Sequence, residues 1–117
     1  MTPTAPTLPK VSDAAAATLE DTGLLKQATG PEMNTSALTI WEGENGAESG
    51  IWECTPGPSR WDLDTNEFIH IVSGRMTVTR DGEGPVEVGP GDNVVFEKGW
   101  GGTWQIEETI RKVYVVF

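Results

Sequence analysis

The chain has 117 residues, of which 37% are hydrophobic, and this length is typical of one domain with one core. It carries 18 acidic and 8 basic residues, and the net charge of −10 argues against nucleic acid and anionic membrane surfaces as partners. Cys54 is the only cysteine, which excludes an internal disulfide. Because no apolar run approaches the length of a membrane span, we expect a soluble, cytoplasmic protein.

Residues 1–30 are predicted to form an N-terminal arm, partly disordered or swapped onto a partner subunit, and residues 31–117 the folded domain. Met1–Lys10 is rich in Thr and Pro and has little to bury, so we expect an extended or disordered segment. Ser12–Leu25 begins with capping residues followed by a run of alanines, which predicts a short helix.

Short runs of β-branched and aromatic residues, separated by Gly- and Pro-rich turns, indicate an all-β sandwich or barrel. The predicted extended segments are Ala37–Glu42, Ser49–Cys54, Arg60–Asp64, Glu67–Ser73, Arg75–Arg80, Val86–Val88, Asn93–Phe96, Thr103–Glu107 and Ile110–Phe117. Because they follow one another at short intervals without helical periodicity between them, all of them are expected to belong to one β-structure.

Glu67–Ser73 combines one carboxylate with apolar residues on both parities, as in a central strand that is buried on both faces. A carboxylate in such a strand needs a cation, a metal or hydrogen-bond donors. Glu67 shares its parity with Ile69 and Ile71, so it should point with them into a barrel. Gly74 then interrupts the run, which predicts a tight corner before a second strand.

The later part of the chain, about residues 37–117, resembles small single-domain cupins similar to ethanolamine-utilisation cupin proteins and ureidoglycine aminohydrolase domains, many of unknown function. The segments that carry the resemblance are Gly50–Gly57, Glu67–Arg75, Gly89–Asp92, Gly99–Trp104 and Arg111–Tyr114. The resemblance implies a cupin jelly-roll barrel, extended here by the N-terminal arm, with its ligand at the barrel mouth.

Metal-binding members of that superfamily supply two histidines just before the glutamate of the first motif and one in the second motif. Glu67 matches the glutamate. By spacing, the histidine positions hold Arg60 and Asp62, or Trp61 and Leu63, for the first pair and Gly102 for the third. With no imidazole at any of them, we expect no stoichiometric transition metal and no other cofactor.

Glu67 is the candidate catalytic residue. Its functional interpretation is a general acid or base, or a carboxylate that holds a ligand; the alternative is a structural carboxylate paired with Lys or Arg across the barrel. Charged and aromatic residues near the predicted mouth are candidate ligand-binding residues: Trp52, Arg60, Trp61, Asp62, Trp104, Lys112 and Tyr114. Lys112 is a candidate partner for Glu67 or an attractant for an anionic substrate, and some of the tryptophans are expected simply to fill the core.

Three weaker signals have simpler explanations. His70, the only histidine, is three residues from Glu67 and therefore points to the opposite face, which favours a packed or interface role. Cys54 has no recognisable histidine partner and is interpreted as a small buried hydrophobe. Asp62, Asp64 and Glu67 could hold a hard cation through oxygen, but a solvated acidic turn is the favoured interpretation.

The sequence thus predicts a cupin that binds a small molecule, with metal-independent acid–base chemistry at Glu67 as its candidate reaction. The alternative is a non-catalytic ligand-binding or structural dimeric module. A homodimer is expected because Glu67–Ser73 and Ile110–Phe117 carry more apolar residues on both parities than one barrel interior needs. The identity of the ligand does not follow from these residues.

Overall fold

The computed structural model describes residues 8–117, so the first seven residues of the predicted arm lie outside the described part of the chain. Within residues 8–117 there is no α-helix, and the all-β prediction is confirmed. The strands are β1 (Glu20–Leu24), β2 (Asn34–Glu42), β3 (Glu48–Cys54), β4 (Gly57–Asp62), β5 (Glu67–Arg80), β6 (Val86–Val88), β7 (Asn93–Phe96) and β8 (Gly101–Val116). A short 3₁₀ turn, η1 (Glu44–Gly46), connects β2 to β3.

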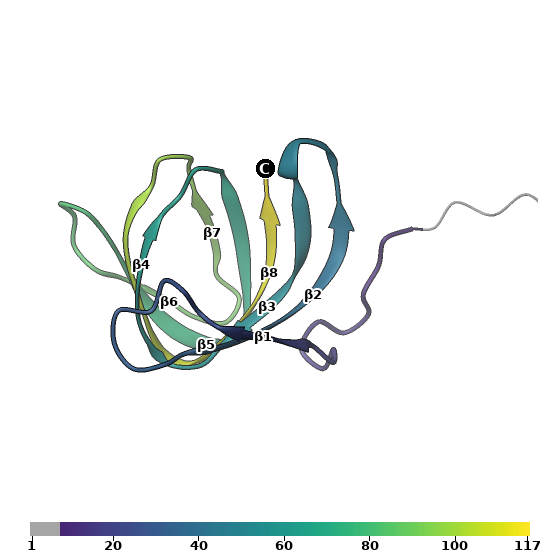
Figure 1. Cartoon of the computed structure of the whole chain (residues 1–117), viewed down its shortest axis with the longest axis horizontal. Helices are drawn as coiled ribbons and strands as arrows, with labels where there is room; N and C mark the ends of the chain where they lie inside the picture. Colours follow the sequence, from purple (N-terminus) through teal and green to yellow (C-terminus); the bar gives the residue numbers. More distant parts are fainter. Residues whose placement is uncertain (1–7) are drawn as a thin grey trace, which may run out of the picture.

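The two longest strands, β5 and β8, organise the barrel by pairing with each other and with most of the remaining strands (Figure 1). Strand β8 also pairs with β3 and β4, and β5 also pairs with β6 and β7. Strands β2 and β1 continue the sheet beyond β3. All these pairings are antiparallel, and the chain ends at the same end of the barrel as the β2–β3 connection (Figure 1).

Each of the two long strands was predicted as two separate strands, and that division is wrong. Gly74 does not end a strand but lies inside β5, with φ of 86°, where the register against β8 shifts between Ile71 and Met76. The irregular register bends β5, as β-bulges do, and the strand continues because it remains paired with β8 on both sides of the bend. The consequence is a single curved two-stranded ribbon that brings both halves of each strand onto one interior.

The predicted helix at Ser12–Leu25 is also wrong. The segment contains a turn at residues 14–16 followed by β1, which pairs with β2. Thr22 and Thr35 join the two strands through their hydroxyl oxygens, 2.6 Å apart. Beyond β1, Leu25 and Ala28 pack against the core, so the region after residue 20 contributes to the sheet and its packing. Residues 20–24 form a strand because the β2 backbone offers them a hydrogen-bonded ladder, while the alanines before them lie in a turn whose carbonyls are bound by Arg111.

Arg111 on β8 holds the turn that precedes β1. Its Nη1 donates to the backbone carbonyls of Ala14, Ala15 and Ala17 at 2.9–3.2 Å, and its Nε donates to Glu53 at 3.1 Å. Neighbouring main-chain carbonyls are thus satisfied by one guanidinium. This contact ties the start of the described chain to the outer side of β3 and β8.

The core lies between the walls of the barrel and is mostly aliphatic with an aromatic end. Its buried members are Met33, Cys54, Ile69, Ile71, Met76, Val78, Val88, Phe96, Trp100, Trp104, Ile106, Ile110 and Tyr114. Ile69 and Ile71 are fully buried, as their inward parity predicted. No helix within residues 8–117 has the length and apolar composition needed to cross a membrane.

Gly74→Ala is expected to destabilise the protein strongly. At this position φ is 86°, and an added Cβ would overlap the backbone carbonyl of Thr109 on the neighbouring strand. Backbone strain and overpacking together should cost roughly 2–5 kcal/mol of unfolding free energy, measured by urea denaturation. Gly82→Ala is the matched control, since its φ of 79° imposes similar strain but no atom lies within 4 Å of the new Cβ. Equal losses in the two variants would contradict this explanation of the bend.

Candidate functional site

Side chains from β3, β4, β5 and β8 line an open cavity of about 200 Å³ at the end of the barrel where β5 begins and β8 ends. Its lining residues are Glu48, Trp52, Trp61, Glu67, Lys112 and Tyr114. The strand register explains their convergence, because Val116 on β8 pairs with both Glu48 and Glu67. Two residues further into the barrel on β8, Tyr114 points to the same side, since side chains alternate along a strand.

The centre of the site is a buried ion pair. Lys112 Nζ lies 3.1 Å from Glu67 Oε2, and only 4% of the lysine side chain and 12% of the glutamate side chain are exposed. The same ammonium lies 4.6 Å from the ring centroids of both Trp52 and Trp104. A carboxylate and two indole faces therefore replace the water that this charge loses on burial.

The aromatic wall beside the ion pair is held rigidly. Trp61 stacks on Trp104 with a centroid distance of 4.3 Å and an interplanar angle of 25°. Trp52 meets Trp61 edge-on, at 6.4 Å and 80°. The indole N–H of Trp61 donates to Ser59 Oγ at 2.8 Å, and Ser59 donates in turn to the backbone carbonyl of Trp104. The positions of these rings are therefore set by the barrel itself.

Tyr114 and Glu48 form a second polar pair on the cavity wall, with the phenol donating to Glu48 Oε2 at 3.0 Å. The phenol lies across β3 where Gly50 has no side chain; a Cβ there would come within 2.8 Å of the Tyr114 hydroxyl. Burial raises the pKa of Tyr114, and the hydrogen bond to Glu48 and the charges of Glu48, Glu67 and Glu42 raise it further. The phenol is thus held in its neutral form.

Glu48 was not among the sequence candidates. In the sequence it follows a turn of polar residues and resembles any solvated acidic side chain. One feature of the sequence could have identified it. Glu48 has the same parity as Gly50 and Trp52, so on a strand its side chain points to the same face as that of Trp52, which was a candidate.

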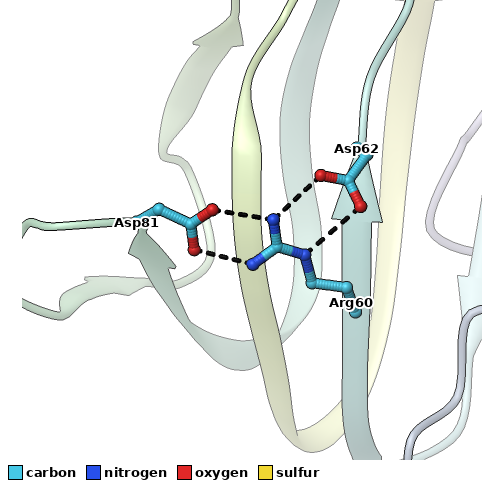
Figure 2. A network of polar contacts seen from close by, with 3 residues as sticks. All are labelled: Arg60, Asp62 and Asp81. Carbon is cyan, nitrogen blue, oxygen red and sulfur yellow. Dashed lines mark hydrogen bonds and ion pairs between the residues drawn. The ribbon is translucent and has the colours of Figure 1, made fainter.

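Three of the sequence candidates do not line the cavity. Trp104 is completely buried and stacks on Trp61, whereas Arg60 and Asp62 lie outside the barrel. Figure 2 shows the Arg60 guanidinium between the carboxylates of Asp62 on β4 and Asp81, just after β5, with contacts of 2.6–3.3 Å. All three side chains are exposed, and Arg60 holds the pKa of both carboxyls below its usual range while its own pKa is raised. Such a solvent-screened network positions the hairpin after β5 more than it stabilises the fold.

Sequence comparison decides the family. A family model described as the EutQ-like cupin domain matches residues 41–114. The chain belongs to this cupin family. No curated protein matches the chain significantly.

Solved structures share the cupin fold. The EutQ protein of Clostridium difficile is 17% identical with a TM-score of 0.71, over 86% of this chain and 80% of that protein. A protein of unknown function from Pseudomonas syringae, of the DUF861 family, is 20% identical with a TM-score of 0.81 over 90% of this chain. This chain spans 46% of that protein's length. A DUF861 family protein from Thermotoga maritima is 36% identical over 57% of this chain and 76% of that protein, with a TM-score of 0.56.

The residues of this cupin do not fit a transition-metal site. Glu67 and Asp62 are the ligand-type residues at the family positions. The Glu67 carboxylate is paired with the Lys112 ammonium, and the Asp62 carboxylate is bound by Arg60 outside the barrel. Gly102, where the third histidine would fall, has no room for a side chain, because an added Cβ would overlap the Thr79 carbonyl. A metal at Glu67 would have to displace a cation that already has a carboxylate and two indole faces around it.

The alternative that Asp62, Asp64 and Glu67 together hold a hard cation is wrong. Within residues 8–117 no group of three or more His, Cys, Asp or Glu side chains is placed to hold a metal ion. The carboxylate of Asp62 is bound by Arg60, while Glu67 is inside the barrel with Lys112. Asp62, Asp64 and Glu67 therefore do not form one site.

His70 and Cys54 also lie apart from the cavity. His70 shares the outward parity of its strand, and its Nδ1 lies 2.7 Å from Asn93 Oδ1. Cys54 is fully buried, and burial raises the pKa of its thiol to about 11. A thiol that is buried and protonated at neutral pH is chemically inert.

Removing either partner of the ion pair should have unequal effects on stability. Lys112→Met leaves the Glu67 carboxylate buried without a cation and should lower the unfolding free energy by about 3–5 kcal/mol. Glu67→Gln keeps an acceptor for Lys112 and leaves both indole contacts in place, so about 1 kcal/mol should be lost.

Urea denaturation of both single variants and of the double variant measures these effects. The double variant, whose interior is neutral, should be more stable than Lys112→Met alone. Additive losses in the double variant would show that the two side chains do not interact.

Proposed function

We propose that this cupin binds a small molecule in the cavity and that Glu67 exchanges a proton with it. The observation that carries the proposal is that the buried Glu67–Lys112 pair lies on the cavity wall rather than inside the packed core. A buried ion pair is often no more stabilising than apolar residues of the same volume. Its position beside a cavity therefore favours a functional role over a structural one.

The geometry of the pair suits acid–base chemistry. Lys112 holds Oε2 of Glu67, and no described residue hydrogen-bonds to Oε1, which remains available to a bound molecule. The ammonium of Lys112 would stabilise negative charge in its neighbourhood, while the carboxylate would accept a proton. Trp52 and Trp61 would supply the apolar contact area.

The interior near the ion pair also contains a buried hydrogen-bond donor for which the described part of the chain provides no acceptor, which lowers the stability of the fold. The indole N–H of Trp104 is buried, and no residue within 8–117 accepts a hydrogen bond from it. An unsatisfied buried donor typically costs about 1–3 kcal/mol. Because Trp104 is fully buried and does not line the cavity, this donor is not available to a bound molecule, and its cost shows only that the interior here is not arranged for stability alone.

A fragment screen by two-dimensional NMR tests the proposal. The five tryptophans provide five indole N–H signals, assignable by single Trp→Phe substitutions. A fragment bound in the cavity should shift the signals of Trp52 and Trp61 and leave that of Trp41, which does not line the cavity, unchanged. Glu67→Gln should weaken binding by about tenfold or more, because a charged hydrogen-bond acceptor becomes neutral.

Asp62→Asn is the matched control, because it also removes one carboxylate charge but lies outside the cavity. It should leave fragment binding unchanged. If no fragment shifts the Trp52 and Trp61 signals, or if the two variants behave alike, the proposed site is wrong.

A mostly apolar row of side chains on the outer face of the sheet supports the alternative function, a structural dimeric module. Trp41, Ser49, Val115, Phe68 and Val95 are successive neighbours across β2, β3, β8, β5 and β7 on this face. Trp41 is 43% exposed and Val95 58% exposed. A mostly apolar row across five strands is more than a solvated face needs, and we propose that it pairs with a second copy of the chain.

Val95→Glu should shift the protein towards a monomer in sedimentation equilibrium at micromolar concentration, because it places a charge in this row. Val86→Glu is the control, since Val86 is similarly exposed, at 60%, but lies on β6 outside the row. A wild-type mass of one subunit would exclude the dimer.

A further inference from the structure

The cavity retains an excess of negative charge. Of its two carboxylates, Glu67 is neutralised by Lys112, whereas Glu48 is hydrogen-bonded only to the neutral phenol of Tyr114. No Lys or Arg within residues 8–117 forms an ion pair with Glu48. Glu42 is the strand neighbour of Glu48 across the β2–β3 hairpin and adds a further negative charge near this wall. The raised pKa of Tyr114 is consistent with this field, since these carboxylates contribute to it after burial.

The aromatic walls complement such a charge distribution. Trp52 and Trp61 stand almost perpendicular, at 80°, and both line the cavity beside the carboxylates. Indole faces attract cations through their quadrupole, and two or more of them around one point form the kind of site that recognises alkylated ammonium groups.

The barrel already contains one ammonium bound in this way. Lys112 Nζ is held by the carboxylate of Glu67 at 3.1 Å and by the faces of Trp52 and Trp104 at 4.6 Å. This internal example shows that a carboxylate combined with indole faces is a sufficient environment for an ammonium in this interior. Glu48, Trp52 and Trp61 line the same cavity, so a carboxylate and two indoles are available to a ligand there as well, and no Lys or Arg within residues 8–117 is paired with this carboxylate.

We propose that the ligand of this cavity is a small organic cation, with its ammonium group near Glu48 and its alkyl groups against Trp52 and Trp61. This inference rests on the proposed binding function and specifies the class of ligand. The cavity volume of about 200 Å³ is below the range of roughly 300–1,000 Å³ of sites that bury drug-sized ligands, so the part of the ligand that this open cavity covers is a small cationic group. The net charge of −10 on the chain would also attract cations from solution.

An anionic ligand fits the cavity less well. The one cation on its wall, Lys112, is 4% exposed and already paired with Glu67. A carboxylate or phosphate would therefore face Glu48 without compensation, and like charges in a partly desolvated cavity repel strongly. The same argument favours the sequence-based interpretation of Lys112 as the partner of Glu67 over that of an attractant for an anionic substrate.

The experiment compares choline, its neutral isostere 3,3-dimethylbutan-1-ol and the smaller anion acetate at constant ionic strength. Titrations follow the indole N–H signals of Trp52 and Trp61. Choline should bind at least about tenfold more tightly than the neutral alcohol, because only the charge differs between them. Acetate should cause no shift of these two signals.

Glu48→Gln should weaken choline binding by about tenfold or more while leaving the affinity for the neutral alcohol unchanged. The amide retains an acceptor for the Tyr114 phenol, and a thermal melt verifies that the variant is folded. Glu87→Gln, which removes the same charge from the exposed strand β6, should bind choline as the wild type does.

Equal affinities for choline and the alcohol, or tighter binding of acetate, would overturn the inference while leaving the proposed function intact, since a ligand would still occupy the cavity. Absence of binding by choline, with other fragments still shifting Trp52 and Trp61, would have the same meaning. If neither choline nor any fragment of the screen shifts these signals, the binding function fails together with its ligand class.

Discussion

Lys112 places a positive charge in an interior that is mostly aromatic and aliphatic, and the side chains around it hold that charge. Its partner Glu67 comes from 45 residues earlier in the chain, and the two indole faces come from β3 and from the other half of β8. The contact with Glu67 depends on the pairing of β5 with β8, and the contact with Trp52 on the pairing of β3 with β8. The ion pair and the barrel are therefore not separable: the strands bring the charges together, and the charges need the strands to remain desolvated in the right geometry.

The chain uses charged groups in two physically different ways. The Arg60–Asp62–Asp81 network has good hydrogen-bond geometry but is exposed, so water and salt screen it and its role is to position a hairpin (Figure 2). The Glu67–Lys112 pair has a single hydrogen bond but is almost completely buried, so each charge depends on the other. For these charged groups, burial therefore indicates the contribution to the stability of the folded state better than the number of hydrogen bonds does.

The cupin fold of this chain recurs in proteins of 17–20% sequence identity, which shows how little of the sequence the barrel itself requires. The site follows other rules. Where a metal-binding cupin would hold imidazoles around a cation, this chain holds an ammonium between a carboxylate and two indoles, with no room at Gly102 for a further ligand. The barrel therefore supplies an interior and an opening, and the side chains on a few strands decide which chemistry is available there.

Periodicity and turn chemistry were sufficient to predict much of the fold. The alternation of Glu67 with Ile69 and Ile71 placed the carboxylate inside the barrel, and the runs at Val86–Val88 and Asn93–Phe96 are strands with the predicted bounds. These features are local, because the direction of a side chain on a strand depends only on its parity. The family motifs extended this local information to the barrel as a whole, and the family-model match over residues 41–114 agrees with them.

The pairing of residues distant in sequence was decided only by the tertiary structure. Nothing near Glu20–Leu24 announces its partner in β2, and a local alanine run suggested a helix instead. Arg60 and Asp62 have the opposite parity to Trp61, but the pairing of β4 with β8 decided that the Trp61 side of the strand faces the cavity and the other side faces outward. Glu48 became part of the site through the register of β3 against β8. The sequence by itself determined which faces of the strands are apolar. Only the closed barrel decided which charged groups meet inside it, because the register between strands depends on the packing of all the strands around one core.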